Sequence, residues 1–123
     1  MKLLLDTHVF IWSVLDAPAL AKRHRDALTS SDVEVFLSAV SVWEMSIKAS
    51  LGKLQVPNDI FETALKAGCQ PLSVSWDHAR AVEALPQHHG DPFDRLLIAQ
   101  ARCEGMTLAT MDEVIAKYDV PIL

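Results

Sequence analysis

Short apolar runs separated by longer amphipathic stretches recur along the whole chain. The short runs predict β-strands, because they are apolar and are bounded by polar or turn-forming residues. They lack the alternation of apolar and polar residues that marks a strand with one face exposed to water. This favours a parallel sheet covered on both faces. The predicted strands are residues 2–5, 33–38, 71–74, 106–109 and 120–123, the last at a sheet edge.

The stretches between these strands carry apolar residues at helical spacing. Gly68, Pro86 and Gly105 lie where three of them are expected to stop. Strands that alternate with helices make right-handed crossovers, so the predicted fold class is a three-layer α/β/α sandwich with a short, mostly parallel central sheet. The predicted helices are residues 7–15, 18–28, 41–54, 58–68, 75–85, 91–105 and 111–118.

Length and charge narrow the possible functions. The 123 residues, half of them hydrophobic, suffice for one compact domain. The net charge of −5 argues against a surface built throughout for nucleic acid, but acids gathered in one site would account for it and leave a nuclease possible. No apolar run reaches the roughly 20 residues of a membrane span, and Asp6 and His8 interrupt the apolar N-terminal stretch. We expect a cytoplasmic protein with no membrane contact.

Carboxylates come after predicted strands or open predicted helices in four separate segments. In a parallel sheet these positions share one edge, and helix 91–105 reaches the same edge because a crossover helix runs antiparallel to the strands. We therefore expect one acidic rim at the edge where such sheets bind ligands. Its members are Asp6 after strand 2–5, Glu44 in the first turn of helix 41–54, Asp91 and Asp94 at the start of helix 91–105, and Asp112 after strand 106–109.

Helix capping explains some of these acids when each is taken alone. Ser41-x-x-Glu44 and Thr110-x-x-Glu113 have the spacing of a capping box, and Asp91 before Pro92 suits a helix start. Asp6 is harder to explain in this way, because a carboxylate directly after a buried strand loses hydration and no Lys or Arg neighbours it.

As a set, the acids point to a metal site. Carboxylates that lie close together repel one another unless a cation sits among them. Oxygen ligands with open positions suit Mg²⁺ or Mn²⁺. Two such ions can activate a water and stabilise the leaving oxygen of a phosphodiester.

Four stretches resemble the PIN-domain ribonucleases, and within them the VapC-type toxins of bacterial toxin–antitoxin pairs. These are LLLDTHVFIW, SAVSVWEMSIKASLGKL, DPFDRLLIAQA and LATMDEVIAKYDV. The resemblance covers essentially the whole chain, in the family's order and at its spacing. It implies a single PIN domain over residues 1–123.

The resemblance also implies a site and an activity. Asp6, Glu44, Asp94 and Asp112 match the family's catalytic, metal-binding acids, and Thr110 matches a hydroxyl residue that supports the last of them. Two roles are possible for Asp91, that of a helix cap and that of an outer ligand of the metal. The implied activity is that of a Mg²⁺- or Mn²⁺-dependent endoribonuclease. Members of this family commonly form homodimers and are inhibited by a cognate antitoxin.

Other functions fit these residues less well. An aspartyl phosphatase of the haloacid-dehalogenase type needs a second Asp two positions after Asp6, where this chain has His8. A receiver-like domain needs an Asp at the end of a middle strand, and FLSAVS and LSVSW offer none. The remaining alternative is a non-catalytic PIN-like module that only binds a partner. Loss of one or more of the four acids would be its mark, and all four are present.

Three further polar residues near the acids are expected to have structural roles. His88 and His89 precede Gly90 and are expected in a solvated turn. Arg95 is expected to form an ion pair with a nearby acid, and contact with an RNA phosphate is the alternative.

Overall fold

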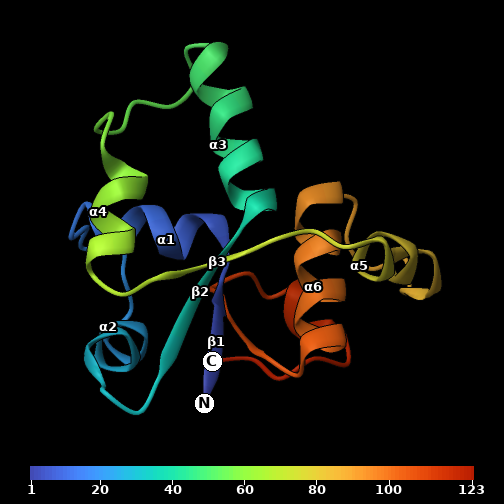
Figure 1. The fold of residues 1–123 in the computed structure, drawn as a ribbon. Helices are drawn as coiled ribbons and strands as arrows, with labels where there is room; N and C mark the ends of the chain where they lie inside the picture. The colour runs from blue at the N-terminus through green and yellow to red at the C-terminus, as the bar shows by residue number, and fades with distance from the viewer.

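Four parallel strands form the central sheet in the order β3-β2-β1-β4 (Figure 1). The computed structural model describes all 123 residues. The register pairs Leu4 of β1 with Phe36 of β2 and with Leu108 of β4, so the carboxyl ends of the strands meet at one edge. This confirms the predicted parallel sheet. The strands are β1 (Lys2–Leu5), β2 (Glu34–Ser38), β3 (Gln70–Leu72) and β4 (Thr107–Ala109).

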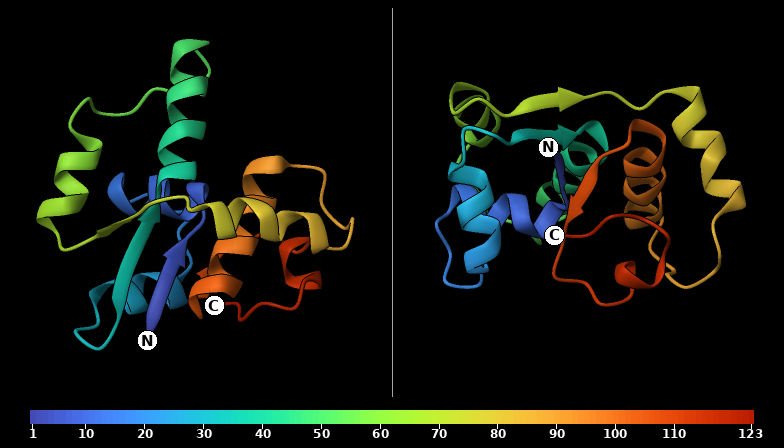
Figure 2. Two further views of the ribbon diagram at one scale, coloured as in Figure 1. Left: turned by 45° about the vertical axis from the view of Figure 1, so that its right-hand side comes forward. Right: turned by 90° about the horizontal axis from the view of Figure 1, so that it is seen from below.

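Helices cover both faces of the sheet, as the two further views show (Figure 2). Helices α1, α2 and α4 lie on one side and α5 and α6 on the other, while α3 rises from the carboxyl edge of β2 (Figure 1). The three-layer α/β/α prediction is therefore confirmed. The helices are α1 (Thr7–Val14), α2 (Lys22–Thr29), α3 (Ala39–Ser50), α4 (Ile60–Lys66), α5 (Trp76–Ala81) and α6 (Pro92–Glu104), with short 3-10 turns η1 (Val82–Ala84) and η2 (Ile115–Lys117).

Successive side chains of β1 pack into opposite layers. Leu3 and Leu5 belong to the apolar cluster with α1 and α4, which includes Phe10. Leu4 belongs to the cluster on the other face, which includes Leu97 of α6. Because a strand points alternate side chains to opposite faces, a strand buried on both faces is apolar at every position. This is why KLLL shows no alternation.

The C-terminal segment departs from the prediction. Residues 111–118 do not form a helix, because the Thr110 and Asp112 side chains accept hydrogen bonds from the amides of Asp112 and Val114 and turn the chain there. Only η2 is helical. Residues 120–123 form no strand but a single parallel bridge between Leu108 and Ile122.

The start of α3 also differs from the prediction. Ser38, the last residue of β2, caps the helix by accepting a hydrogen bond from the Val40 amide at 3.0 Å. The strand passes into the helix with no loop between them, so the Ser41–Glu44 capping box was a wrong prediction and Glu44 lies in the second turn. No helix of this chain combines the length and the apolar character needed to cross a membrane.

Candidate active site

Asp6 and Thr110 lie side by side at the point where the strand order reverses. The chain runs from β1 to β2 and β3 on one side and returns to place β4 on the other side of β1. The Asp6 amide donates to the Ala109 carbonyl at 3.0 Å, which extends the pairing of the two strands to their ends. In parallel α/β sheets such a switch point is the usual place for a ligand.

Both oxygens of the buried Asp6 carboxylate accept a hydrogen bond. Oδ1 accepts from the Val9 amide at 2.8 Å and Oδ2 accepts from the Thr110 hydroxyl at 2.5 Å. Asp6 is thus the N-cap of α1, a structural role that was not predicted for it. Burial raises the pKa of Asp6, and the bonds from Thr110 and Val9 offset part of this rise.

Glu44 points from α3 toward the start of α1 and is buried. Its Oε1 accepts a hydrogen bond from the Thr7 hydroxyl at 2.8 Å, since a carboxylate can only accept. Its Oε2 lies 2.6 Å from Lys48 Nζ, one turn further along α3. The hydrogen bond to Glu44 raises the pKa of Lys48, and the charges of Asp91 and Asp94 add to this effect. Lys48 is 42% exposed, so an ammonium group stands at the edge of the acidic rim.

Two aspartates stand at the start of α6 and have different roles. Asp91 caps the helix, because its Oδ1 accepts hydrogen bonds from the amides of Phe93 at 2.8 Å and Asp94 at 3.4 Å. This confirms the capping interpretation of Asp91. Burial and then the charge of Asp91 raise the pKa of Asp94 to about 7, with smaller contributions from Asp6 and Glu44.

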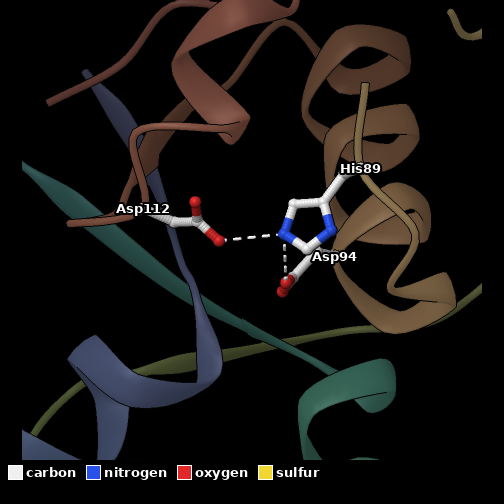
Figure 3. Close-up of side chains that lie close together, drawn as sticks. All are labelled: His89, Asp94 and Asp112. Carbon is white, nitrogen blue, oxygen red and sulfur yellow. Dashed lines mark hydrogen bonds and ion pairs between the residues drawn. The ribbon is translucent and has the colours of Figure 1, made fainter. Parts of the chain in front are cut away.

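Asp112 is joined to Asp94 through the ring of His89 (Figure 3). His89 Nε2 lies 2.9 Å from Asp112 Oδ2 and 3.1 Å from Asp94 Oδ2. The expectation of a solvated turn was wrong for His89, whose side chain is only 17% exposed. Burial raises the pKa of Asp112, but hydrogen bonds from His89 and from the Val114 amide outweigh it and hold the pKa below its ordinary value.

The structure brings the predicted acids to one region but not into one tight group. Ligand atoms of His89, Asp94 and Asp112 lie within 4.8 Å of one another. Asp6 and Glu44 fall outside this group, although their charges act on Asp94. Thr110 connects the two parts, because its hydroxyl donates to Asp6 and accepts from the Asp112 amide. The hydroxyl thus bonds the Asp6 carboxylate and the Asp112 backbone.

Arg95 contacts neither an acid nor an open surface, so the expected ion pair was wrong. Its guanidinium is buried and donates to the Pro86 carbonyl at 2.7 Å, to the Tyr118 hydroxyl at 3.1 Å and to the carbonyls of Val82 and Leu85. These carbonyls belong to the segment of residues 82–86, which follows α5. Arg95 therefore holds the loop that leads to His89.

A large open cavity lies away from the acids. Its volume is about 700 Å³, and its walls come from α1, α2, β2 and α4, with Phe10 and Val35 among them. None of the four acids lines it. The ionisable side chains and their hydrogen bonds, and not the cavity volume, therefore mark the candidate site.

The fold and this rim define an α/β protein with carboxylates at the switch point of a parallel sheet. The family model of the PIN domain matches residues 3–121, and the chain belongs to this family. It is similar to Ribonuclease VapC22 of Mycobacterium tuberculosis, with 27% identity over 121 residues that cover 96% of this chain and 92% of that protein.

Solved structures with the same fold include chains of toxin–antitoxin complexes. The structure of VapBC2 from Rickettsia felis, bound to a DNA fragment from its promoter, contains a chain with a TM-score of 0.75 and 12% identity, covering 100% of this chain and 98% of that chain. A chain of FitAcB from Neisseria gonorrhoeae gives a TM-score of 0.61 and 22% identity, with coverage of 98% and 96%. At these identities the likeness establishes the fold.

Proposed function

We propose that the protein is a metal-dependent endoribonuclease and the toxin of a toxin–antitoxin pair. The observation that carries the proposal is the crowding of carboxylates around Asp94, whose pKa is raised to about 7 by burial and by like charges. Carboxylates in such a place are stabilised by a cation among them. The relative from Mycobacterium tuberculosis is named a ribonuclease, which supports the reaction class.

The donor set fits Mg²⁺ or Mn²⁺. We assign Asp6, Glu44, Asp94 and Asp112 to the binding of one or two such ions, because carboxylate oxygens suit hard cations. The hydrogen bonds to Asp6 and Asp112 use one direction at each oxygen, so further lone pairs are available. A bound ion supplies an activated water and neutralises charge on the phosphodiester.

The chain's own residues hold these acids in place. Thr110 orients Asp6, and Thr7 orients Glu44, so both carboxylates are fixed before any substrate arrives. Preorganised charge of this kind lowers the cost of stabilising a transition state. Lys48, partly exposed beside Glu44, is the cation of this rim that we assign to an RNA phosphate.

We also propose a cognate antitoxin and a second copy of the chain as protein partners. Trp43 and Trp76 are 59% and 87% exposed, which is unusual for large apolar side chains and suits a covered surface. The related folds come from structures of VapBC and of FitAcB. A partner that brings Arg or Lys to the acidic rim would pair with its carboxylates.

The test is cleavage of RNA by the purified protein with Mn²⁺ and, in a matched reaction, with EDTA. We expect cleavage only with the metal, and none by Asp94→Asn. The control is Asp119→Asn, which changes an exposed acid outside the rim. Tight binding of a partner protein without metal-dependent cleavage of RNA would instead identify a non-catalytic binding module.

A further inference from the structure

The hydrogen bonds of His89 define which of its ring nitrogens carries a proton. Nδ1 accepts a hydrogen bond from the Asp91 amide at 3.0 Å, so Nδ1 has no hydrogen. The proton of the neutral ring is therefore on Nε2, the nitrogen that faces the carboxylates. Nε2 donates to Asp112 Oδ2, 2.9 Å away, and also approaches Asp94 Oδ2. His89 is thus an N–H donor placed between two acids (Figure 3).

Contacts from distant parts of the chain hold His89 in this position. The buried Tyr118 hydroxyl accepts hydrogen bonds from the His88 amide at 3.1 Å and the His89 amide at 2.8 Å. Arg95 donates to the same hydroxyl and to the Pro86 carbonyl, so the backbone before His89 is fixed at several points. The ring itself is mostly covered. Its orientation is therefore built into the fold.

We propose that His89 is a positioning residue that competes with a divalent cation for Asp94 Oδ2 and Asp112 Oδ2. A metal ligand needs a free lone pair, and the tautomer fixed by the Asp91 amide points a hydrogen at the place where a cation would bind. An ion that takes both oxygens has to displace the Nε2–H group from them. The proposal rests on the metal-dependent function proposed above.

The hydrogen bonds of His89 stabilise a site of like charges when no metal is bound. Without metal, the N–H donor between Asp94 and Asp112 keeps two carboxylates together that would otherwise repel each other. The site is then formed in advance, and the broken hydrogen bonds reduce the affinity for the ion. His89 thereby sets how much free metal the protein needs.

Calorimetric titration of the full chain with Mn²⁺ at one fixed pH tests the proposal. We expect His89→Ala to bind Mn²⁺ more tightly, by on the order of tenfold, because no charge-assisted hydrogen bond has to be broken. His89→Gln keeps an N–H donor at a similar distance from the backbone and should bind close to the wild type. His88→Ala is the matched control, because the exposed His88 ring packs edge-on against Tyr118 but bonds neither acid, and the variant keeps the amide that donates to Tyr118.

Each other outcome of the titration overturns the proposal. Weaker binding by His89→Ala would show that the imidazole is itself a ligand, and unchanged binding would show no competition. If the wild type bound no Mn²⁺, the proposed metal dependence would fail as well. If the wild type bound Mn²⁺ and cleaved RNA while His89→Ala bound no more tightly, only the role of His89 would fail.

A measurement on the wild type avoids dependence on the folding of a variant. Proton–nitrogen correlation spectra report which ring nitrogen of His89 carries the hydrogen. We expect the Nε2–H form both without metal and at saturating Mg²⁺. In the second case the hydrogen stays on Nε2 but no longer bonds the carboxylates. Loss of the Nε2 proton on addition of Mg²⁺ would identify a metal ligand and overturn the proposal.

Discussion

The Thr110 hydroxyl donates a hydrogen bond of 2.5 Å to Asp6 Oδ2 across 104 positions of the sequence. The Thr110 hydroxyl oxygen also accepts a hydrogen bond from the Asp112 amide at 3.0 Å. One side chain after β4 therefore orients the acid after β1 and begins the turn that carries Asp112. Asp6 and Asp112 are thus linked through Thr110 and not by a direct bond to each other. Their relative placement therefore depends on a hydroxyl group that is not itself an acid.

Replacing Thr110 with valine keeps the shape of the side chain and removes both hydrogen bonds. We expect Thr110→Val to lower RNA cleavage by roughly 10–100-fold, the usual effect of losing a residue that orients a metal ligand. We also expect a loss of about 1–3 kcal/mol in the free energy of unfolding, because the buried Asp6 carboxylate loses a donor and the partly buried Asp112 amide loses its acceptor. Thr110→Ser retains the hydroxyl and serves as control. Equal activity of the two variants would contradict this role.

Asparagine in place of Asp6 separates the charge of this side chain from its capping role. The amide oxygen of Asp6→Asn still accepts the Val9 amide, so α1 and the fold should be retained. Cleavage should fall by more than the roughly 100-fold typical of an outer-shell change, because the charge that binds the ion is gone. Far-UV circular dichroism and an RNA cleavage assay measure the two effects.

Asp91→Asn should be much milder than Asp94→Asn. Asparagine caps helices about as well as aspartate, and the Asp91 Oδ1 atom is occupied by the amides at the start of α6. Asp94 accepts no helix amide and meets Asp112 through His89. An inactive Asp91→Asn together with an active Asp94→Asn would reverse our assignment of the two residues.

The sheet and the rim were predictable because they depend on local patterns. The unbroken apolar run at Leu3–Leu5 predicted a strand buried on both faces, and parallel strands bring their carboxyl ends to one edge. Asp6 and Asp112 could therefore be placed near each other without a structure. Asp91 was recognisable as a cap because the signal, Asp before Pro, lies within the segment itself.

The roles of His89 and Arg95 were not predictable, because long-range packing decides them. His89 adjoins the acids only because Tyr118, far along the chain, accepts its backbone amide. Arg95 lies beside acids in the sequence, but its guanidinium is buried against the carbonyls of Val82, which begins η1, and Leu85, which follows η1. A histidine two residues before a helix cap was the one local signal for His89, and alone it is weak. The two predicted capping boxes failed because Ser38, and not Ser41, caps α3, and because Thr110 bonds Asp6 and the Asp112 amide.

The raised pKa of Asp94 predicts how stability depends on pH without metal. An unfolded Asp releases its proton near 3.8, whereas folded Asp94 holds it until about 7. Between these values the folded state binds more protons, so the Asp94 contribution to stability is present in full below the lower value and is lost as pH rises through about 7. Urea denaturation in EDTA should show this loss in the wild type and much less of it in Asp94→Asn. Asp6, whose pKa is also raised, keeps a slope of the same sign in both.

Addition of Mn²⁺ should reverse this destabilisation. The ion binds ionised carboxylates, so its effect on the melting temperature should grow as pH rises toward the Asp94 pKa of about 7. At about 100 times its dissociation constant, a ligand of the folded state adds about 2.7 kcal/mol to stability. Differential scanning calorimetry should show a higher melting temperature for the wild type and a smaller shift for Asp6→Asn. A melting temperature that did not change on addition of millimolar Mn²⁺ would argue strongly against a metal site.

Lysine in place of Arg95 tests whether this side chain supports the loop or binds RNA. The buried guanidinium donates to three carbonyls and to Tyr118, and a single ammonium cannot reach all four acceptors. Arg95→Lys should therefore lower the free energy of unfolding by about 1–3 kcal/mol, because buried acceptors lose their donors. Arg102→Lys, on the exposed side of α6, is the matched control and should be near neutral. The loosened loop should also weaken the contacts of His89 with Asp94 and Asp112 and so raise the affinity for Mn²⁺. A fully stable Arg95→Lys that lost only RNA binding would instead place Arg95 at a phosphate.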